Sequence, residues 1–452
     1  MGVFDFLKKN KTEKEKNISS HYLTGKEVRE IAKANMAEMR RLEKAKNRKA
    51  PKSEYVTEMK DDGNILEIED LNTYFFTDQG VVKAVNGVSF NIPLNSTVGV
   101  VGESGCGKSV TSMSVMRLIQ GPSGQIVSGS IRFKAYDFKT DANGKYIPVY
   151  EKDEHGNVIT EKVLDKEGNV KLDKEGNPVT RPVQKKTESG LGVYEKEETV
   201  YDIAKMPIRE MYRLRGRQMS MVFQEPMTSL NPVFTIGNQL DEVTLLHVPG
   251  ATKGIAKKRS IEMLNMVGIA MPERVYASYP HELSGGMRQR VMIAMALAGE
   301  PRLIIADEPT TALDVTIQAQ ILDLFNDLKK RINGSILLIT HDLGVIAEMA
   351  DYVVVMYAGR IIEQGTASEI FHNPCHPYTQ GLQKSKPTMK SNSDKLFNIP
   401  GNVPNPINMP SHCYFKERCS KCIKECSGDY PCMVQVSPTH FVACHLYNPK
   451  EK

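Results

Sequence analysis

Residues Gly102–Ser109 combine glycines, a lysine and a serine at a spacing that suits a phosphate group. They fit the pattern G-x4-G-K-[ST] and follow the apolar run Val98–Val101. Glycines let backbone N–H groups wrap around phosphates, and the N-terminus of a following helix adds favourable potential. Lys108 is therefore predicted to reach the β- and γ-phosphates of a nucleotide, and Ser109 to ligate Mg²⁺.

A second pair of candidate groups, Asp307 and Glu308, ends the apolar run Leu303–Ala306. Beside a phosphate loop, Asp307 is predicted to hold Mg²⁺ through water and Glu308 to polarise the attacking water. Two adjacent carboxylates at a strand end also fit a solvated loop, but the phosphate loop argues against that alternative.

The elements that position these groups alternate along the chain. Helical patterns at Gly286–Ala298 and Thr316–Ile332 alternate with apolar strands at 303–306 and 336–339. Strands that alternate with helices predict an α/β domain with a mainly parallel sheet.

A third segment, Leu283-Ser-Gly-Gly-Met-Arg-Gln-Arg, opens a helix between the two candidate sites. Here the chain resembles the ATP-binding cassette (ABC) family of transporter ATPases, whose signature is LSGGMRQR. The family's other elements follow in order: Phe75 where an aromatic ring stacks on adenine, Gln224 of the Q-loop, Asp314 of the D-loop and the switch histidine His341. The resemblance covers about residues 64–371, apart from an insertion.

The resemblance implies an α/β P-loop NTPase fold of ABC-ATPase type, with a helical subdomain that carries the signature. It also implies that two cassettes close head to tail around two ATP molecules. Because the chain has one phosphate loop and one signature, a second ATPase subunit is required, either a distinct chain in a heterodimer or a copy in a homodimer.

The resemblance also assigns the site residues. The catalytic residues are Glu308, His341 and Gln224, and the Mg²⁺ ligands are Ser109, Gln224 and Asp307. The nucleotide contacts are Phe75, Gly102, Glu103, Ser104, Gly105, Cys106, Gly107, Lys108, Ser109, Val110, Ser284, Gly285, Gly286 and Asp314. Cys106 is expected to sit beside the phosphates, where alkylation would block the nucleotide; a small residue that merely fits is the alternative.

Residues 138–200 interrupt the α/β pattern with near-repeats: DEHGN at 153, and DKEGN at 165 and 173. Gly and Asn tolerate the positive φ of tight hairpin turns, so the segment predicts an inserted β-meander. An Asp-rich calcium loop is the alternative, but the EF-hand spacing and its terminal Glu are missing.

The positive charge is concentrated at the N-terminus. The 452 residues carry a net charge of +5, but residues 1–60 hold 16 Lys and Arg against 9 Asp and Glu, and the remainder holds 43 against 45. Residues 61–452 are therefore close to neutral, and their net charge does not indicate a nucleic-acid partner. The extension predicts a basic amphipathic helix at 26–48 or a solvated tail, and the anionic inner leaflet of a membrane is its candidate partner. No run approaches the roughly 20 apolar residues of a spanning helix.

The region 372–452 is rich in Pro, Asn, Ser and Cys. It contains His376-Pro-Tyr-Thr and Ile399-Pro-Gly, and six of the eight cysteines lie between Cys413 and Cys444. This region resembles the C-terminus of the ATP-binding subunits of oligopeptide, dipeptide and nickel importers. That resemblance implies a [4Fe–4S] cluster on Cys413, Cys419, Cys426 and Cys444, with zinc or free thiols as alternatives. Cys422 and Cys432 are additional, so the choice of the four ligands stays open.

The resemblance implies a peripheral ATPase on the cytoplasmic face of the membrane that powers uptake of oligopeptides or dipeptides. Two permease subunits and an extracytoplasmic peptide-binding protein are the implied partners. An importer of nickel or another small solute is the alternative. A soluble ATPase that acts on nucleic acid or the ribosome is disfavoured, because two cassettes in one chain or a coiled-coil insertion are missing. The cysteine-bearing tail argues against an exporter, and intact Lys108, Asp307 and Glu308 argue against a module without turnover.

Overall fold

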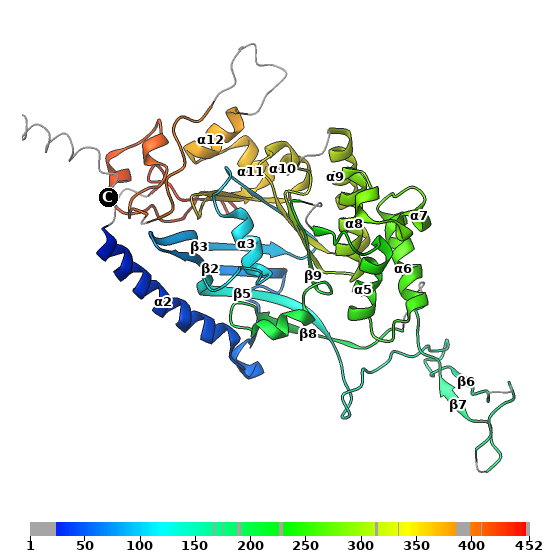
Figure 1. Ribbon diagram of the computed structural model, residues 1–452. Coiled ribbons are helices and arrows are strands. Elements are labelled where there is room, and N and C mark those ends of the chain that lie inside the picture. The colour runs from blue at the N-terminus through cyan, green and yellow to red at the C-terminus, as the bar shows by residue number, and fades with distance from the viewer. Residues whose placement is uncertain are drawn as a thin grey trace, which may run out of the picture.

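The computed structural model (Figure 1) describes most of the chain after residue 23. The described residues are 24–165, 168–173, 175–187, 190, 192–225, 229–311, 315–332, 334–385, 398–407 and 409–448.

A mainly parallel sheet forms the centre of the molecule. Its eight strands lie in the order β14-β15-β13-β12-β4-β11-β10-β9, and the strands from β12 to β9 run parallel. Their bounds are β4 Thr97–Val101, β9 Met219–Val222, β10 Leu303–Asp307, β11 Ser335–Ile339, β12 Tyr352–Tyr357, β13 Arg360–Thr366, β14 Val434–Gln435 and β15 Phe441–Val442. Every residue of β4, β10 and β11 is buried, as expected for strands that are covered on both faces.

A second, antiparallel sheet has the order β1-β8-β5-β2-β3. Its bounds are β1 Val56–Thr57, β2 Asn64–Thr77, β3 Gly80–Pro93, β5 Gly124–Phe138 and β8 Lys196–Asp202. Apolar side chains of both sheets share one buried cluster, which includes Leu66, Phe133 and Ile305. The two sheets therefore pack on each other and place the loop after β4 between them.

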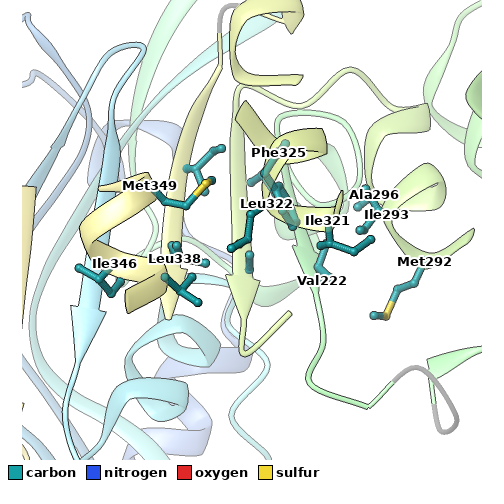
Figure 2. Packing of buried hydrophobic residues seen from close by; sticks show 14 of the residues in the cluster. Val222, Met292, Ile293, Ala296, Ile321, Leu322, Phe325, Leu338, Ile346 and Met349 are labelled. Carbon is teal, nitrogen blue, oxygen red and sulfur yellow. The ribbon is translucent and has the colours of Figure 1, made fainter. Parts of the chain in front are cut away.

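Helices cover the other face of the central sheet. Their bounds are α5 Ile236–His247, α6 Lys253–Met266, α7 Pro272–Ala277, α8 Gly285–Ala298, α9 Val315–Ile332, α10 Leu343–Met349, α11 Ala367–His372 and α12 Pro377–Lys384. Helix α3 (Lys108–Val115) instead packs between the two sheets, where it contacts β2, β3 and β10 and where Val115 belongs to the shared cluster. Figure 2 shows Met292 and Ile293 of α8, Phe325 of α9 and Leu338 of β11 in this core. Helices α5 to α8 contact one another and form a helical subdomain that begins after β9.

The N-terminal helix α2 (Gly25–Asn47) lies along the antiparallel sheet (Figure 1). Its first turn has a capping box between Thr24 and Glu27. Asn35 donates a hydrogen bond to the carbonyl of Thr77 at 2.8 Å, and Leu42 is buried. The helix expected at 26–48 is therefore present, and it packs on β2, β3 and β5 of the antiparallel sheet. Residues 1–23 of the same extension lie outside the described residues.

The insertion leaves the antiparallel sheet between β5 and β8 and extends away from the body (Figure 1). Within the insertion, β6 (Thr160–Lys162) pairs with β7 (Thr180–Pro182). Pro148 pairs with Tyr194, and this bridge encloses the β6–β7 pair along the chain. At the tips an Asp carboxylate accepts a hydrogen bond from the backbone four residues later, as Asp153 does from Asn157 at 2.8 Å. The repeated Asp-x2-Gly-Asn motif thus forms turns through local hydrogen bonds.

The C-terminal region is attached to the central sheet. Strand β15 pairs with β13, with Val442 opposite Glu363, and Ile407 forms a bridge with Val82 of β3. Among the residues that the structure describes, no helix is both long and apolar enough to span a bilayer.

Candidate functional site

The phosphate loop connects β4 to α3, and its shape requires glycine. The φ angles of Gly102, Gly105 and Gly107 are +155°, +79° and +100°. A Cβ atom on Gly102 would lie 2.3 Å from the carbonyl oxygen of Met356, and one on Gly107 would lie 2.3 Å from that of Ala84. The loop therefore fits closely against β12 and β3, and glycine alone accommodates both the φ angles and the contacts.

Lys108 lies over this loop and is almost fully buried. Its Nζ donates to the carbonyls of Gly102 at 2.8 Å and Glu103 at 3.1 Å. An ammonium group at this position, next to the N-terminus of α3, faces the place where the loop amides would hold phosphate oxygens.

Ser109 and Asp307 meet across the site, from α3 and the end of β10. The Ser109 hydroxyl donates to Asp307 Oδ1 at 3.0 Å. Burial raises the pKa of Asp307 to about 6; the Ser109 hydrogen bond opposes this rise and the neighbouring charge of Glu308 adds to it. A hydroxyl and a carboxylate side by side are hard oxygen ligands of the kind that Mg²⁺ prefers.

Glu308 follows Asp307 with a φ of +48°, a strained conformation for a residue with a side chain. Its carboxylate accepts hydrogen bonds from Gln224 Nε2 at 3.0 Å and Thr311 Oγ1 at 3.0 Å, and lies 3.2 Å from His341 Nδ1. Burial raises the pKa of Glu308, but the bonds with His341 and Thr311 outweigh it and leave the pKa below its usual value. The group therefore stays ionised and can accept a proton from water.

These side chains line one open cleft of about 680 Å³. Its lining residues are Ala84, Glu103, Ser104, Gly105, Gly107, Lys108, Ser109, Val110, Gln224, Glu308, Thr311 and His341. Thr311 was missed in the sequence, because a threonine in a loop carries no signal until the fold brings it to Glu308.

The predicted signature residues and Phe75 lie elsewhere. Ser284 caps α8 by accepting a hydrogen bond from Met287 N, and Gly286 packs near Ile317 of α9, so the signature is not part of this chain's own cleft. The ring of Phe75 faces Gly124, where a Cβ atom would be 2.8 Å from it, and it does not line the cleft. Asp314 lies outside the described residues.

Cys106 does not lie where the alkylation argument needs it. Its side chain is 1% exposed and belongs to the apolar cluster between the two sheets. Burial raises the pKa of this thiol despite the nearby charge of Lys108. The expectation that reagents reach a thiol beside the phosphates is therefore wrong, because the loop turns this side chain inward and leaves only its backbone available to a nucleotide.

The predicted cysteine ligands gather in the C-terminal region. Cys426 and Cys444 are buried, Cys413 and Cys419 are half-buried, and none of the four forms a disulfide. Burial raises the pKa of Cys413 to about 11, and Cys426, Cys444 and Cys419 each add to the rise through their charge. The four thiols are thus close enough to influence one another. Cys422 is exposed, but it lies beside them, because burial and then Cys426 and Cys419 raise the pKa of its thiol. Cys432 is also exposed.

A different group brings its ligand-type atoms within 4.8 Å of one another: Glu363, Cys375 and His440, all buried. Glu363 accepts hydrogen bonds from the backbone N–H groups of Cys375 at 2.6 Å and His376 at 2.9 Å, and lies 2.8 Å from His440 Nε2. These partners already satisfy the carboxylate, so the group ties β13 to the C-terminal region. Residues so far apart in the sequence gave no signal of this cluster.

Comparison with known proteins agrees with the site. The ABC transporter family model matches residues 85–156 and 156–311, and the model of the oligopeptide/dipeptide transporter C-terminal region matches 362–426. The oligopeptide transport ATP-binding proteins AppD and OppD of Bacillus subtilis are 42% and 43% identical to the chain over 85% of its length, covering 97% and 89% of their own. The dipeptide transport ATP-binding protein DppD of the same organism is 39% identical, with 85% and 96% covered.

The resemblance drawn from the motifs is thereby confirmed. The phosphate loop and Glu308 line one cleft, and Asp307 is hydrogen-bonded to Ser109 at its wall, as an ATPase requires. The chain is an ABC-type ATPase that belongs to the oligopeptide/dipeptide transporter family of ATP-binding subunits.

Proposed function

We propose that this ATPase powers the uptake of oligopeptides or dipeptides across the cytoplasmic membrane, from whose cytoplasmic face it works. The observation that carries the proposal is the cleft lined by Lys108, Ser109 and Glu308, with Asp307 hydrogen-bonded to Ser109. Relatives named for oligopeptide and for dipeptide transport match almost equally well, so peptides as a class are the proposed cargo. Nickel or another small solute is the second candidate.

In this proposal Lys108 and the loop amides bind the β- and γ-phosphates. Ser109, Asp307 and Gln224 would hold Mg²⁺, which neutralises phosphate charge when bound. Glu308 accepts a proton from the attacking water, and Gln224 and His341 hold the Glu308 carboxylate in place.

The complete site is proposed to need a second ATPase subunit. The signature residues 284–286 do not line their own chain's cleft, so the N-terminus of α8 is available to a nucleotide bound by a partner cassette. Asp314 would lie at the same interface. Phe75 is proposed to stack on adenine after its ring turns from Gly124. A heterodimer with a related chain is favoured over a homodimer.

Two permease subunits and an extracytoplasmic peptide-binding protein are the proposed transport partners. Val233 and Phe234, shortly after Gln224, expose 74% and 52% of their surface, and Leu246 at the end of α5 exposes 70%. Exposed apolar side chains that follow the Q-loop closely in the sequence, as Val233 and Phe234 do, suit a membrane subunit that senses the nucleotide through Gln224.

The test is to co-express the tagged chain with the permeases and second cassette encoded beside it. Co-purification, and ATPase activity that rises when peptide and peptide-binding protein are added to the reconstituted complex, are expected. Stimulation by nickel or another small solute alone would favour the second candidate. Association with RNA or DNA that survives high salt would contradict the transporter function.

We further propose that Cys413, Cys419, Cys426 and Cys444 hold a [4Fe–4S] cluster. Soft thiolates in a partly buried pocket suit either iron–sulfur or zinc. Zinc would need sulfur atoms roughly 3.8 Å apart, from Zn–S bonds of about 2.3 Å in a tetrahedron. The spacing of the four cysteines, C-x5-C-x6-C-x17-C, resembles an iron–sulfur ligand set, and this resemblance favours the cluster over zinc.

If these cysteines hold the cluster, replacing one of them should lower the amount of bound iron. In anaerobically purified protein, Cys413→Ala is expected to lower bound iron and sulfide and the visible absorption that accompanies them, because one of four ligands is lost. The matched control is Cys432→Ala, which removes an exposed thiol outside the four. Stoichiometric zinc with no iron would contradict the cluster, and equal iron loss in both variants would contradict the ligand set.

A further inference from the structure

The second residue of the phosphate loop, Glu103, is held by the C-terminal region. Arg418 Nη1 donates to Glu103 Oε2 at 2.9 Å, and Arg418 Nη2 donates to Glu103 Oε1 at 3.0 Å. Two parallel charge-assisted hydrogen bonds between a guanidinium and a carboxylate fix orientation as well as distance. This contact joins residues 315 positions apart in the sequence.

The backbone of Glu103 is held from the same side. Its N–H donates to the hydroxyl oxygen of Tyr378, on α12, at 2.8 Å. Both the main chain and the side chain of this loop residue therefore bond to segments that follow the ATPase body.

Arg418 is itself rigidly held. Its Nε donates to the carbonyl of Pro400 at 2.9 Å, and its Nη1 to Tyr357 Oη at 3.3 Å. The Arg418 side chain is 6% exposed, so its charge depends on Glu103 for compensation. Burial lowers the pKa of Arg418, but the bonds with Glu103 and Tyr357 outweigh it and raise the pKa above its usual value.

Three aromatic rings pack around this contact. The centroids of Tyr357 and Tyr378 are 4.8 Å apart, and Phe415 lies 5.3 Å from Tyr357 and 5.5 Å from Tyr378. Tyr357 ends β12 of the ATPase body, whereas Phe415 and Tyr378 belong to the C-terminal region. The three rings thus pack across the interface between the two regions, and this packing limits the conformations open to the Arg418 side chain.

Glu103 in turn orients the lysine that faces the phosphates. Its carbonyl accepts a hydrogen bond from Lys108 Nζ at 3.1 Å, next to the Gly102 carbonyl at 2.8 Å. A continuous set of contacts therefore runs from Arg418 through Glu103 to Lys108.

We propose that Arg418 and Tyr378 are positioning residues that hold the phosphate loop in its nucleotide-binding shape. The C-terminal region is then a part of the ATP site that the phosphate loop needs, in addition to carrying cysteines. A loop ordered in advance loses less conformational entropy when a nucleotide binds. This inference rests on the proposed binding of MgATP in the cleft. The contact between Arg418 and Glu103 also lies next to the cysteines, because Arg418 directly precedes Cys419 in the sequence.

The test uses Arg418→Met in the purified full chain, with MgATP as the ligand. We expect the Kd and KM for MgATP to rise about tenfold, within the range of typical coupling between sites. The kcat should change little, because Glu308 and His341 do not contact Arg418. The matched control is Lys424→Met, which removes an exposed positive charge from the same region without a bond to the loop.

Three further measurements separate positioning from a general loss of structure. Arg418→Met should keep its bound metal and its cooperative thermal unfolding. Glu103→Gln should weaken MgATP binding as Arg418→Met does, and the double variant should bind no more weakly than the weaker single variant. Tyr378→Phe, which keeps the ring and removes the acceptor oxygen, should weaken binding about fivefold, the equivalent of about 1 kcal/mol for one hydrogen bond.

Unchanged MgATP affinity in folded Arg418→Met would overturn the proposal, as would additive losses in the double variant. If Arg418→Met does not fold, Tyr378→Phe decides in the same way, and unchanged affinity there would also overturn it. A wild-type chain that binds no MgATP would instead contradict the proposed function, so the two failures are distinguishable.

Discussion

Replacing Glu308 with glutamine is expected to reduce the kcat for ATP hydrolysis by a factor of about 10² to 10⁴, the usual contribution of a general base. The amide has nearly the same shape, so the hydrogen bonds from Gln224 and Thr311 can still be accepted by its oxygen. An amide cannot take a proton from water, however. The Kd for MgATP should therefore stay close to that of the unchanged protein while turnover nearly stops.

The measurement is single-turnover hydrolysis beside direct nucleotide binding. Glu348→Gln is the matched control, because this carboxylate is exposed on α10 and outside the cleft. Retained turnover in Glu308→Gln would show that another group accepts the proton. A gain of stable dimer with MgATP would additionally support the composite site, because the bound phosphate would then persist between the two chains.

Replacing Lys108 with alanine is expected to weaken MgATP binding about 10- to 100-fold, which corresponds to the 1.5–3 kcal/mol of a charged hydrogen bond. The ammonium donates to two loop carbonyls, and it is well placed to exchange one of them for phosphate oxygens. The affinity for MgADP should fall less than that for MgATP if Lys108 contacts both the β- and γ-phosphates.

Calorimetry with MgATP and MgADP tests whether the affinity for MgATP falls more than the affinity for MgADP. Circular dichroism shows whether the variant is folded. Lys330→Ala, an exposed lysine of α9, serves as the control. Equal affinity for MgATP in Lys108→Ala and the control would remove Lys108 from the site.

Much of the ATPase body was predictable because its signals are local. The strand expected at 303–306 is β10, which ends at Asp307, and the helix expected at 286–298 is α8, which begins at Gly285. Buried parallel strands are short apolar runs, and a helix that covers them repeats its apolar residues every three or four positions. The glycines of the phosphate loop were equally clear, since their spacing follows from the shape of the loop itself.

Side-chain direction was less predictable. Cys106 stands among phosphate-loop residues in the sequence, yet its thiol points into the core. The α2 helix was expected from its spacing, but its position on the antiparallel sheet depends on Asn35 reaching the carbonyl of Thr77. Such orientations are set by the packing of neighbours that lie far away along the chain.

By itself, the sequence determined the order of the motifs, the elements that carry them and the family, because each depends on residues within one or two turns of chain. The tertiary structure decided which of these residues meet: Glu308 with Gln224, Thr311 and His341 in one cleft, and Glu103 with Arg418 across 315 positions. A hydrogen bond between distant residues needs both partners to be placed by the packing of two sheets and a C-terminal region. The local periodicity of the sequence therefore cannot predict such a hydrogen bond.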